Sequence, residues 1–258
     1  MGVLGIDIGG SGIKGAIVNV ETGEFISDRH RIPTPEAAKP SDVADTVKEL
    51  IDHFRYTGPV GSGFPAVMLH GVAMTAANIH QDWIGSDVEA LFHERTGLPV
   101  YVANDADVAG LAEIRFGAGR GVRGTILVLT LGTGVGSAIF VNGVLVPNTE
   151  FGHLKIRNKD AEQRTSDGAR QRRGYTYEIW AEKLNEHLSA LEALLWPDLI
   201  IIGGGVSKHH AAFFPYLRTR ARLVPAQLLN QAGIVGAALY AVGRHRAAAH
   251  SLDQPTAG

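Results

Sequence analysis

Three glycine-rich turns are the features of this sequence best suited to bind phosphate. They lie at residues 8–12, 132–136 and 203–205, and each follows a run of apolar residues typical of a buried strand. Glycine has no Cβ, so backbone N–H groups in such a turn can approach phosphate oxygens closely. A single turn of this kind is usually only a tight turn, whereas three of them in one chain predict a phosphate-binding site.

Two other phosphate-binding patterns do not fit. Residues 10–15 match the G-x-G-x-x-G spacing of dinucleotide-binding folds, but that pattern requires the glycines to open a helix. Here they lead into residues 16–20, which are rich in β-forming side chains. The Walker A pattern is absent, because no glycine precedes a Lys-Ser or Lys-Thr pair at the required spacing. A Rossmann fold or a P-loop is therefore disfavoured.

Two aspartates stand at strand ends, where their carboxylates suit phosphoryl transfer. Asp7 stands between the first strand and its glycines, where it can hold Mg²⁺ through water while Lys14 or the backbone contacts phosphate. Asp105 lies where a strand ends and a helix begins, and a carboxylate there can take the proton of an acceptor hydroxyl. Both aspartates also have a structural alternative, Asp7 as an acceptor for turn N–H groups and Asp105 as a helix N-cap.

The apolar pattern predicts the elements that position these residues. Strands are expected at 3–8, 16–20, 25–27, 66–72, 100–103, 125–131, 137–141 and 199–202, and helices at 41–54, 87–96, 105–116, 177–195 and from 234 onward. Ser41 is the expected N-cap of the first helix. Residues 155–174 carry many basic and few apolar side chains, which predicts a surface segment. Strands followed by glycine turns in both halves indicate two related α/β lobes.

Composition argues against several other classes of protein. The 258 residues are 45% hydrophobic and 19% charged with a formal net charge of -2, unlike a disordered chain or a general nucleic-acid binder. The absence of cysteine excludes disulfides and Cys-ligated zinc. No signal peptide is recognisable, and no apolar run reaches the ~20 residues of a membrane span. We therefore expect a cytoplasmic protein with no membrane and no nucleic-acid partner.

Five motifs together resemble those of the actin-like sugar kinases of the ROK (repressor, open reading frame, kinase) family. Residues 5–14 resemble the first phosphate motif, 131–137 the second, 202–207 the adenosine-side motif, and 103–106 and 150–153 the sugar-binding motifs. They occur in the family order over residues 5–240. The resemblance implies an α/β fold of two actin-like (RNase H-like) lobes with a central cleft, and a kinase that phosphorylates a sugar.

The resemblance also implies roles for single residues. Asp105 is expected to be the catalytic base, and Asp7 to hold Mg²⁺ through water. The expected sugar contacts are Asn78, Asn104, Asp105, Glu150, His153 and Glu162. The expected phosphate contacts are Asp7, Gly9, Gly10, Ser11, Gly12, Lys14, Thr130, Gly132, Thr133, Gly134, Gly204 and Gly205.

Residues 155–174 stand where typical family members carry a cysteine-rich zinc motif, so we expect no zinc. Loss of that motif, together with stretches such as 31–35 and 191–198, resembles the bacterial polyphosphate glucokinases. The resemblance implies glucose as acceptor, with polyphosphate, ATP or both as phosphate donor. The chain departs from that subfamily in the loop between Asn78 and Trp83, which lacks the usual lysine. The basic residues of 155–174 either guide a polyphosphate chain or form a solvated surface.

Two other functions remain open from the sequence. One is an ATP-dependent kinase for another hexose or an N-acetylhexosamine. The other is a non-catalytic sugar sensor, but sensors in this family carry an N-terminal helix-turn-helix and the first motif here begins at Gly5. We expect a small lobe of residues 1–104 plus a C-terminal helix at 234–246, and a large lobe of residues 105–232. The family also implies a homodimer.

Overall fold

The structure, a computed structural model, describes residues 1–77 and 79–252. The chain forms two compact units, the first of Met1–Ala112 with Gln231–Gly258 and the second of Glu113–Asn230. It passes from one unit to the other within helix α3 (Asp105–Phe116) and again just before α7 (Ala232–Leu252). The sequence-based boundary fell at residue 105, the start of α3, and α7 is longer than the helix expected at 234–246. Among the described residues, no helix has both the length and the apolar composition to cross a bilayer.

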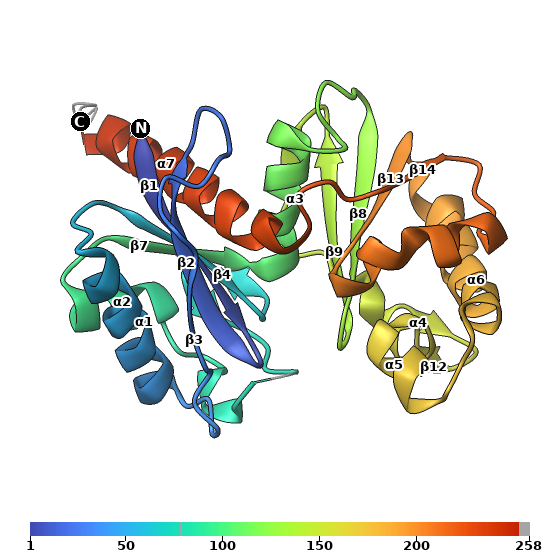
Figure 1. Cartoon of the computed structure of the whole chain (residues 1–258), viewed down its shortest axis with the longest axis horizontal. Helices are drawn as coiled ribbons and strands as arrows, with labels where there is room; N and C mark the ends of the chain where they lie inside the picture. Colours follow the sequence, from blue (N-terminus) through green and yellow to red (C-terminus); the bar gives the residue numbers. More distant parts are fainter. Residues whose placement is uncertain (78, 253–258) are drawn as a thin grey trace, which may run out of the picture. The chain divides into compact units, whose positions relative to one another are not determined.

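The sheet of the first unit has five strands in the order β3-β2-β1-β4-β7 (Figure 1). β1 (Gly2–Gly9), β2 (Gly12–Asn19) and β3 (His30–Ile32) are successive antiparallel partners. β4 (Val60–Phe64) and β7 (Val100–Asn104) continue in parallel from β1. Two expected strands were wrong. Residues 25–27 form only an isolated bridge at Phe25, and 66–72 hold the short pair β5 (Met68–Leu69) and β6 (Val72–Ala73).

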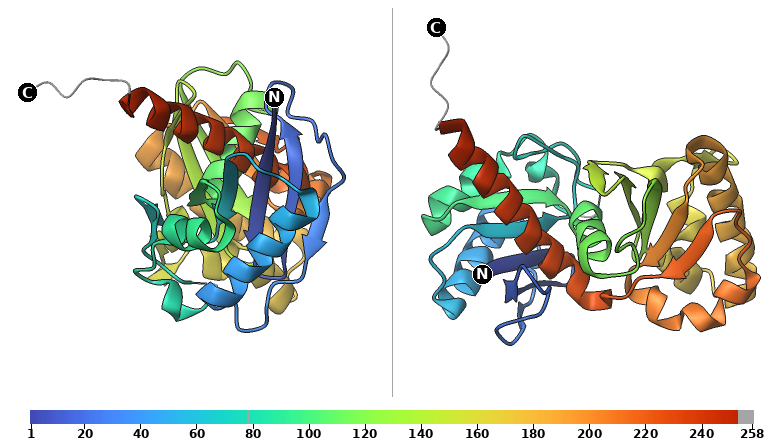
Figure 2. Two further views of the ribbon diagram at one scale, coloured as in Figure 1. Left: turned by 90° about the vertical axis from the view of Figure 1, so that its left-hand side faces the viewer. Right: turned by 90° about the horizontal axis from the view of Figure 1, so that it is seen from above.

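Helices cover both faces of this sheet. On one face, α1 (Pro40–Phe54) and α2 (Val88–Thr96) pack with Leu4 and Ile6 in an apolar core. α7 crosses the other face, as Figure 2 shows, and approaches the strand backbone closely. A Cβ on Gly61 would lie 3.1 Å from the amide nitrogen of Ala238, so the glycine permits this approach. α1 begins at Pro40, and the expected cap Ser41 lies inside the helix.

The sheet of the second unit repeats the same topology, in the order β10-β9-β8-β13-β14. β8 (Thr125–Leu131), β9 (Val135–Val141) and β10 (Val144–Val146) are successive antiparallel partners. β13 (Leu199–Gly203) and β14 (Arg222–Pro225) continue in parallel from β8. In each unit a glycine turn joins the central strand to its antiparallel neighbour, so the prediction of two related lobes is confirmed.

One long helix, α6 (Tyr177–Leu195), packs Trp180, Leu184 and Leu188 on the second sheet. Residues 155–174 lie largely at the surface, as expected, but they also form regular elements. They form the hairpin β11 (Lys155–Ile156) and β12 (Lys159–Asp160), then α4 (Glu162–Thr165) and α5 (Asp167–Arg172). Their buried side chains are small, such as Thr165 and Ala169, which is why the apolar pattern did not predict them. Short 3₁₀ turns η1 (Gln81–Trp83), η2 (Phe151–His153), η3 (Gly205–Ala212), η4 (Phe214–Tyr216) and η5 (Leu229–Gln231) complete the fold.

A buried carboxylate fixes the segment that leads to α7. Glu113, near the end of α3, accepts hydrogen bonds from the backbone N–H groups of Ala118 at 2.9 Å, Gln227 at 2.9 Å and Leu228 at 2.7 Å. Bonds from N–H groups to a carboxylate are stronger than neutral ones. Glu113 therefore ties the end of α3 to residues 227–228 within the second unit.

Candidate active site

The first glycine turn lies between β1 and β2, next to the start of α7. Asp7 and Lys14 face each other across the two strands, and Lys14 Nζ is 3.4 Å from Asp7 Oδ2. A Cβ on Gly233, in the first turn of α7, would lie 3.0 Å from Asp7 Cγ, so the carboxylate sits at the positive end of that helix. The first unit thus brings together its predicted phosphate contacts, Asp7, Gly9, Gly10, Ser11, Gly12 and Lys14.

The turn is open on one side and braced on another. A Cβ on Gly10 would meet nothing within 4 Å, so none of the described residues fills the space beside it. The hydroxyl of Thr34 donates to the carbonyl of Gly9 at 2.5 Å, and the guanidinium of Arg31 donates to the carbonyl of Ser11. Sequence reasoning missed both braces, because these side chains reach backbone groups more than a hairpin away and no spacing rule predicts such a bond.

Asn104 and Asp105 occupy the junction of β7 and α3. The side-chain oxygen of Asn104 accepts from the N–H groups of Ala106 at 2.9 Å and Asp107 at 3.2 Å, the bonds of an N-cap. Its Nδ2 donates to the carbonyl of Ala66 at 3.1 Å. Asn104 is 6% exposed and therefore holds this junction together, while Asp105 follows as the first helical residue and is half-buried.

A pocket of about 330 Å³ lies beside the first glycine turn, within the first unit. Phe64 and Trp83 contribute apolar walls, while Gly9, Gly10 and Thr34 line its polar edge. Concave sites with an apolar lining and a few polar groups are typical of small-ligand binding. Asn78, the other expected sugar contact from this part of the chain, lies outside the described residues.

The second and third glycine turns meet at one edge of the second sheet. β8 and β13 run parallel, and Thr130 is paired with Gly203 where both strands end. Gly204 has a φ of +79°, and a Cβ there would lie 2.6 Å from the amide nitrogen of Leu131, so only glycine fits. Gly132 and Gly205 instead border open space. The structure therefore brings together the predicted contacts of this unit, Thr130, Gly132, Thr133, Gly134, Gly204 and Gly205.

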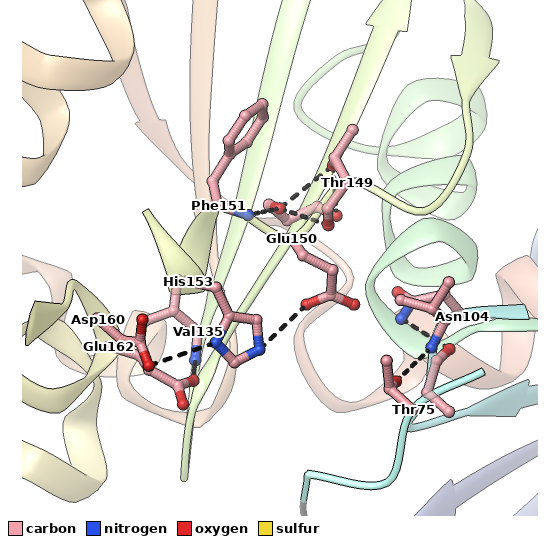
Figure 3. Close-up of polar contacts among 12 residues, drawn as sticks. Thr75, Asn104, Val135, Thr149, Glu150, Phe151, His153, Asp160 and Glu162 are labelled. Atoms are coloured by element: carbon pink, nitrogen blue, oxygen red, sulfur yellow. Dashed lines mark hydrogen bonds and ion pairs between the residues drawn. The ribbon is translucent and has the colours of Figure 1, made fainter. Parts of the chain in front are cut away.

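Three predicted sugar contacts gather near that edge (Figure 3). Glu150 Oε2 is 4.0 Å from Nε2 of His153, whose Nδ1 is 3.8 Å from a carboxylate oxygen of Asp160. Glu162 accepts from the N–H of Val135 at 3.1 Å, within the second glycine turn. The pKa of Glu150 is raised, mainly because the carboxyl group is buried. The nearby His153 lowers this pKa, and the negative charge of Glu162 raises it. A hydrogen bond thus links Glu162, a predicted sugar contact, to the glycine turn that is predicted to bind phosphate.

A buried network supports this group. Ser137 Oγ donates to the carbonyl of Thr149 at 2.7 Å and accepts from the N–H of Phe151 at 3.0 Å. His187 on α6 contacts both neighbouring segments. Its Nε2 is 3.0 Å from the carbonyl oxygen of Phe151, and its Nδ1 is 3.3 Å from Thr165 Oγ1. α6 therefore holds both η2, which follows Glu150, and α4, which begins with Glu162. Sequence reasoning missed His187, although a histidine on the apolar face of a predicted helix was a usable signal.

His187 predicts a loss of stability in acid. Burial lowers its pKa from 6.5 to about 4, although the bond to Phe151 opposes this. Between these two values the unfolded chain binds a proton that the folded protein excludes. The free energy of unfolding should therefore be constant above pH 6.5 with respect to this group and fall by about 3 kcal/mol as the pH drops to 4. Urea unfolding over this pH range measures the loss.

The control is a pair of variants. His187→Gln, which does not titrate, should show a shallower dependence of unfolding free energy on pH, whatever its stability at pH 7. His209→Gln, at an exposed position, should keep the wild-type dependence. Equal slopes in wild type and His187→Gln would contradict the assignment.

Two units with one sheet topology, each carrying a glycine turn beside its central strand, define the actin-like fold of the sugar kinases. The chain belongs to the ROK family, whose model matches residues 3–171. The family and the fold expected from the sequence are thereby confirmed. Among the described residues, no group of three or more His, Cys, Asp or Glu side chains is arranged to hold a metal.

The chain is similar over nearly its whole length to individual members of that family. A polyphosphate glucokinase of Mycobacterium tuberculosis is 47% identical over 93% of this chain and 91% of that protein. The crystal structure of an inorganic polyphosphate/ATP-glucomannokinase from Arthrobacter sp. strain KM is 47% identical, covers 95% of this chain and 99% of its own, and has a TM-score of 0.92. A ROK family glucokinase from Streptomyces griseus, in complex with glucose and AMPPNP, is 26% identical over 94% of this chain and 100% of its own, with a TM-score of 0.79.

Proposed function

We propose that this chain is a glucokinase that transfers a phosphoryl group from inorganic polyphosphate, ATP or both to the 6-hydroxyl of glucose. The observation that carries the proposal is the hydrogen bond of Glu162 to Val135. It anchors a carboxylate suited to sugar hydroxyls directly on a glycine turn suited to phosphate. The similarity to proteins named for glucose and polyphosphate supports the choice of substrates.

In this proposal Asp105 is the catalytic base. The 6-hydroxyl oxygen of glucose attacks the terminal phosphorus, its proton passes to the Asp105 carboxylate, and the bond from phosphorus to the bridging oxygen breaks. The products are glucose 6-phosphate and a donor shortened by one phosphoryl group. Glu150, His153 and Glu162 bind sugar hydroxyls, since carboxylates and imidazoles can fix the orientation of such groups. Asn104 contributes mainly by holding Asp105 at the start of α3.

Magnesium fits the first glycine turn. Mg²⁺ is usually held by one or two carboxylates together with substrate phosphates, and it keeps several waters. Asp7 offers such a carboxylate, 24% exposed and beside Lys14. When bound, the ion offsets the negative charge of the donor phosphates. A homodimer and a cytoplasmic location belong to the same proposal, and light scattering of the purified protein tests the first.

A donor and acceptor panel tests the proposal. Purified protein is given glucose, mannose or N-acetylglucosamine, each with ATP or with polyphosphate, and sugar phosphate is measured. Mannose is included because the Arthrobacter relative is named a glucomannokinase. We expect glucose to be phosphorylated, with polyphosphate among the donors used. Turnover of N-acetylglucosamine alone, or no turnover of any sugar, would overturn the proposal.

A further inference from the structure

Three charged side chains form a row across neighbouring strands of the first sheet. Asp7 on β1 is paired with Lys14 on β2, and Lys14 is paired with Arg31 on β3. Directly opposed residues of neighbouring antiparallel strands point to the same face of a sheet. The row therefore runs outward from the first glycine turn with one negative and two positive charges.

Arg31 makes two contacts with that turn. Its Nη2 donates to the carbonyl of Ser11. Its guanidinium also lies close to Gly12, since a Cβ on Gly12 would be 2.7 Å from Arg31 Cζ. The absence of a side chain at Gly12 is thus what lets a cation reach the turn.

The contact of Arg31 with Ser11 uses only part of what the side chain offers. A guanidinium carries five N–H donors in a planar fork that matches phosphate oxygens. Arg31 is exposed, and Lys14 is 27% exposed, so phosphate can reach both. The row spans two strand spacings, roughly 10 Å, which a chain of several phosphates can follow but a single phosphate group cannot.

We propose that Arg31, with Lys14, forms a subsite for the donor chain beyond the transferred phosphoryl group, and that its ligand is a linear inorganic polyphosphate. This inference rests on the proposed function, in which the first glycine turn binds donor phosphate. The subsite gives this chain a cation beside the polyanion even though the loop between residues 78 and 83 lacks lysine. It discriminates by donor length, because a longer polyphosphate reaches Arg31 in addition to Lys14.

The alternative is that Arg31 only braces the glycine turn and does not bind the donor. A substitution of Thr34 distinguishes these two roles. Thr34 braces the same turn by donating to Gly9 but carries no charge. In Thr34→Val the KM for polyphosphate and the KM for ATP should therefore change by the same factor. In Arg31→Ala the KM for long-chain polyphosphate should rise about tenfold or more, as for loss of a hydrogen bond to a charged group, while the KM for ATP changes much less.

The experiment measures KM for long-chain polyphosphate and for ATP, with glucose saturating, in wild type, Arg31→Ala, Arg31→Lys, Thr34→Val and Arg123→Ala. The ratio of the two KM values should rise about tenfold in Arg31→Ala and less in Arg31→Lys. It should stay within about two-fold of wild type in Thr34→Val and in Arg123→Ala, which removes an exposed arginine of the second unit. Titration calorimetry with long-chain polyphosphate in the absence of glucose should show the same loss of binding in Arg31→Ala.

The possible failures are distinguishable. An unchanged ratio in Arg31→Ala, in a wild-type enzyme that uses polyphosphate, overturns the subsite and leaves the proposed function standing. A wild-type enzyme that neither binds nor uses polyphosphate overturns both the subsite and the polyphosphate donor. A protein that phosphorylates no sugar but loses polyphosphate binding in Arg31→Ala overturns the proposed function and supports the subsite.

Discussion

Replacing Asp105 by asparagine is expected to lower kcat for glucose phosphorylation by about 10²–10⁴-fold, the usual contribution of a general base, while glucose still binds. Asparagine keeps the shape and hydrogen-bonding reach of the side chain but cannot accept the proton of the 6-hydroxyl. The fold should be retained, because Asn104 supplies the N-cap bonds of α3 at 2.9 and 3.2 Å, and an asparagine oxygen at 105 can still accept the 2.7 Å bond from the N–H of Ala106. Steady-state kinetics give kcat, and titration calorimetry gives the Kd for glucose.

The matched control is Asp87→Asn. Asp87 is the N-cap of α2 and accepts from the N–H of Ala90 at 2.9 Å, a role that asparagine fills equally well. It makes the same chemical change at another helix start and should leave kcat unaltered. If Asp105→Asn kept kcat within a few-fold of wild type, Asp105 would not be the base.

The second large effect is expected from Gly10→Ala, which should reduce kcat/KM for the phosphate donor by about 10²-fold without lowering stability. A Cβ on Gly10 meets no atom of the described part of the chain within 4 Å, and the residue does not have a positive φ, so the folded protein accommodates alanine. The same methyl group occupies the open side of the turn, where a donor phosphate must approach the backbone. A displacement of about 1 Å is enough to cost a factor of about 10².

Thermal unfolding and donor kinetics, measured together, test this expectation. Gly243→Ala is the control, since a Cβ there also meets nothing within 4 Å but the residue lies far along α7. Alanine favours a helix over glycine by about 1 kcal/mol, so this variant should be slightly more stable and fully active. Wild-type donor kinetics in Gly10→Ala would show that phosphate does not approach this turn.

How well the fold can be predicted from sequence depends on which side chains are buried. α6 and β8 match their predicted bounds of 177–195 and 125–131 because large apolar residues mark their buried faces. β4 was missed because its sequence, Val-Gly-Ser-Gly-Phe, places glycines at every second position. Those glycines let helical backbone approach the sheet. This is a tertiary contact, which strand propensities do not take into account.

The candidate site also contains some residues that the sequence predicts and others that it does not. Glycine turns and the acidic side chains near them are visible in the sequence, because each is a local pattern with a chemical meaning. The residues that hold these groups in place are not visible in this way. Thr34 reaches Gly9, and His187 reaches Phe151, only after the chain has folded. Asn104 is intermediate, because the sequence indicated an N-cap at this helix start but suggested Asp105 for it, whereas the structure gives the N-cap bonds to Asn104, one residue earlier.

The most direct test of the central claim is phosphorus NMR of the wild-type protein with glucose, Mg²⁺ and either polyphosphate or ATP. We predict a new phosphate monoester resonance, coupled to the two protons on C6 of glucose, that grows as the donor shortens. Growth of orthophosphate alone, or a monoester on another carbon of the sugar, would contradict the account.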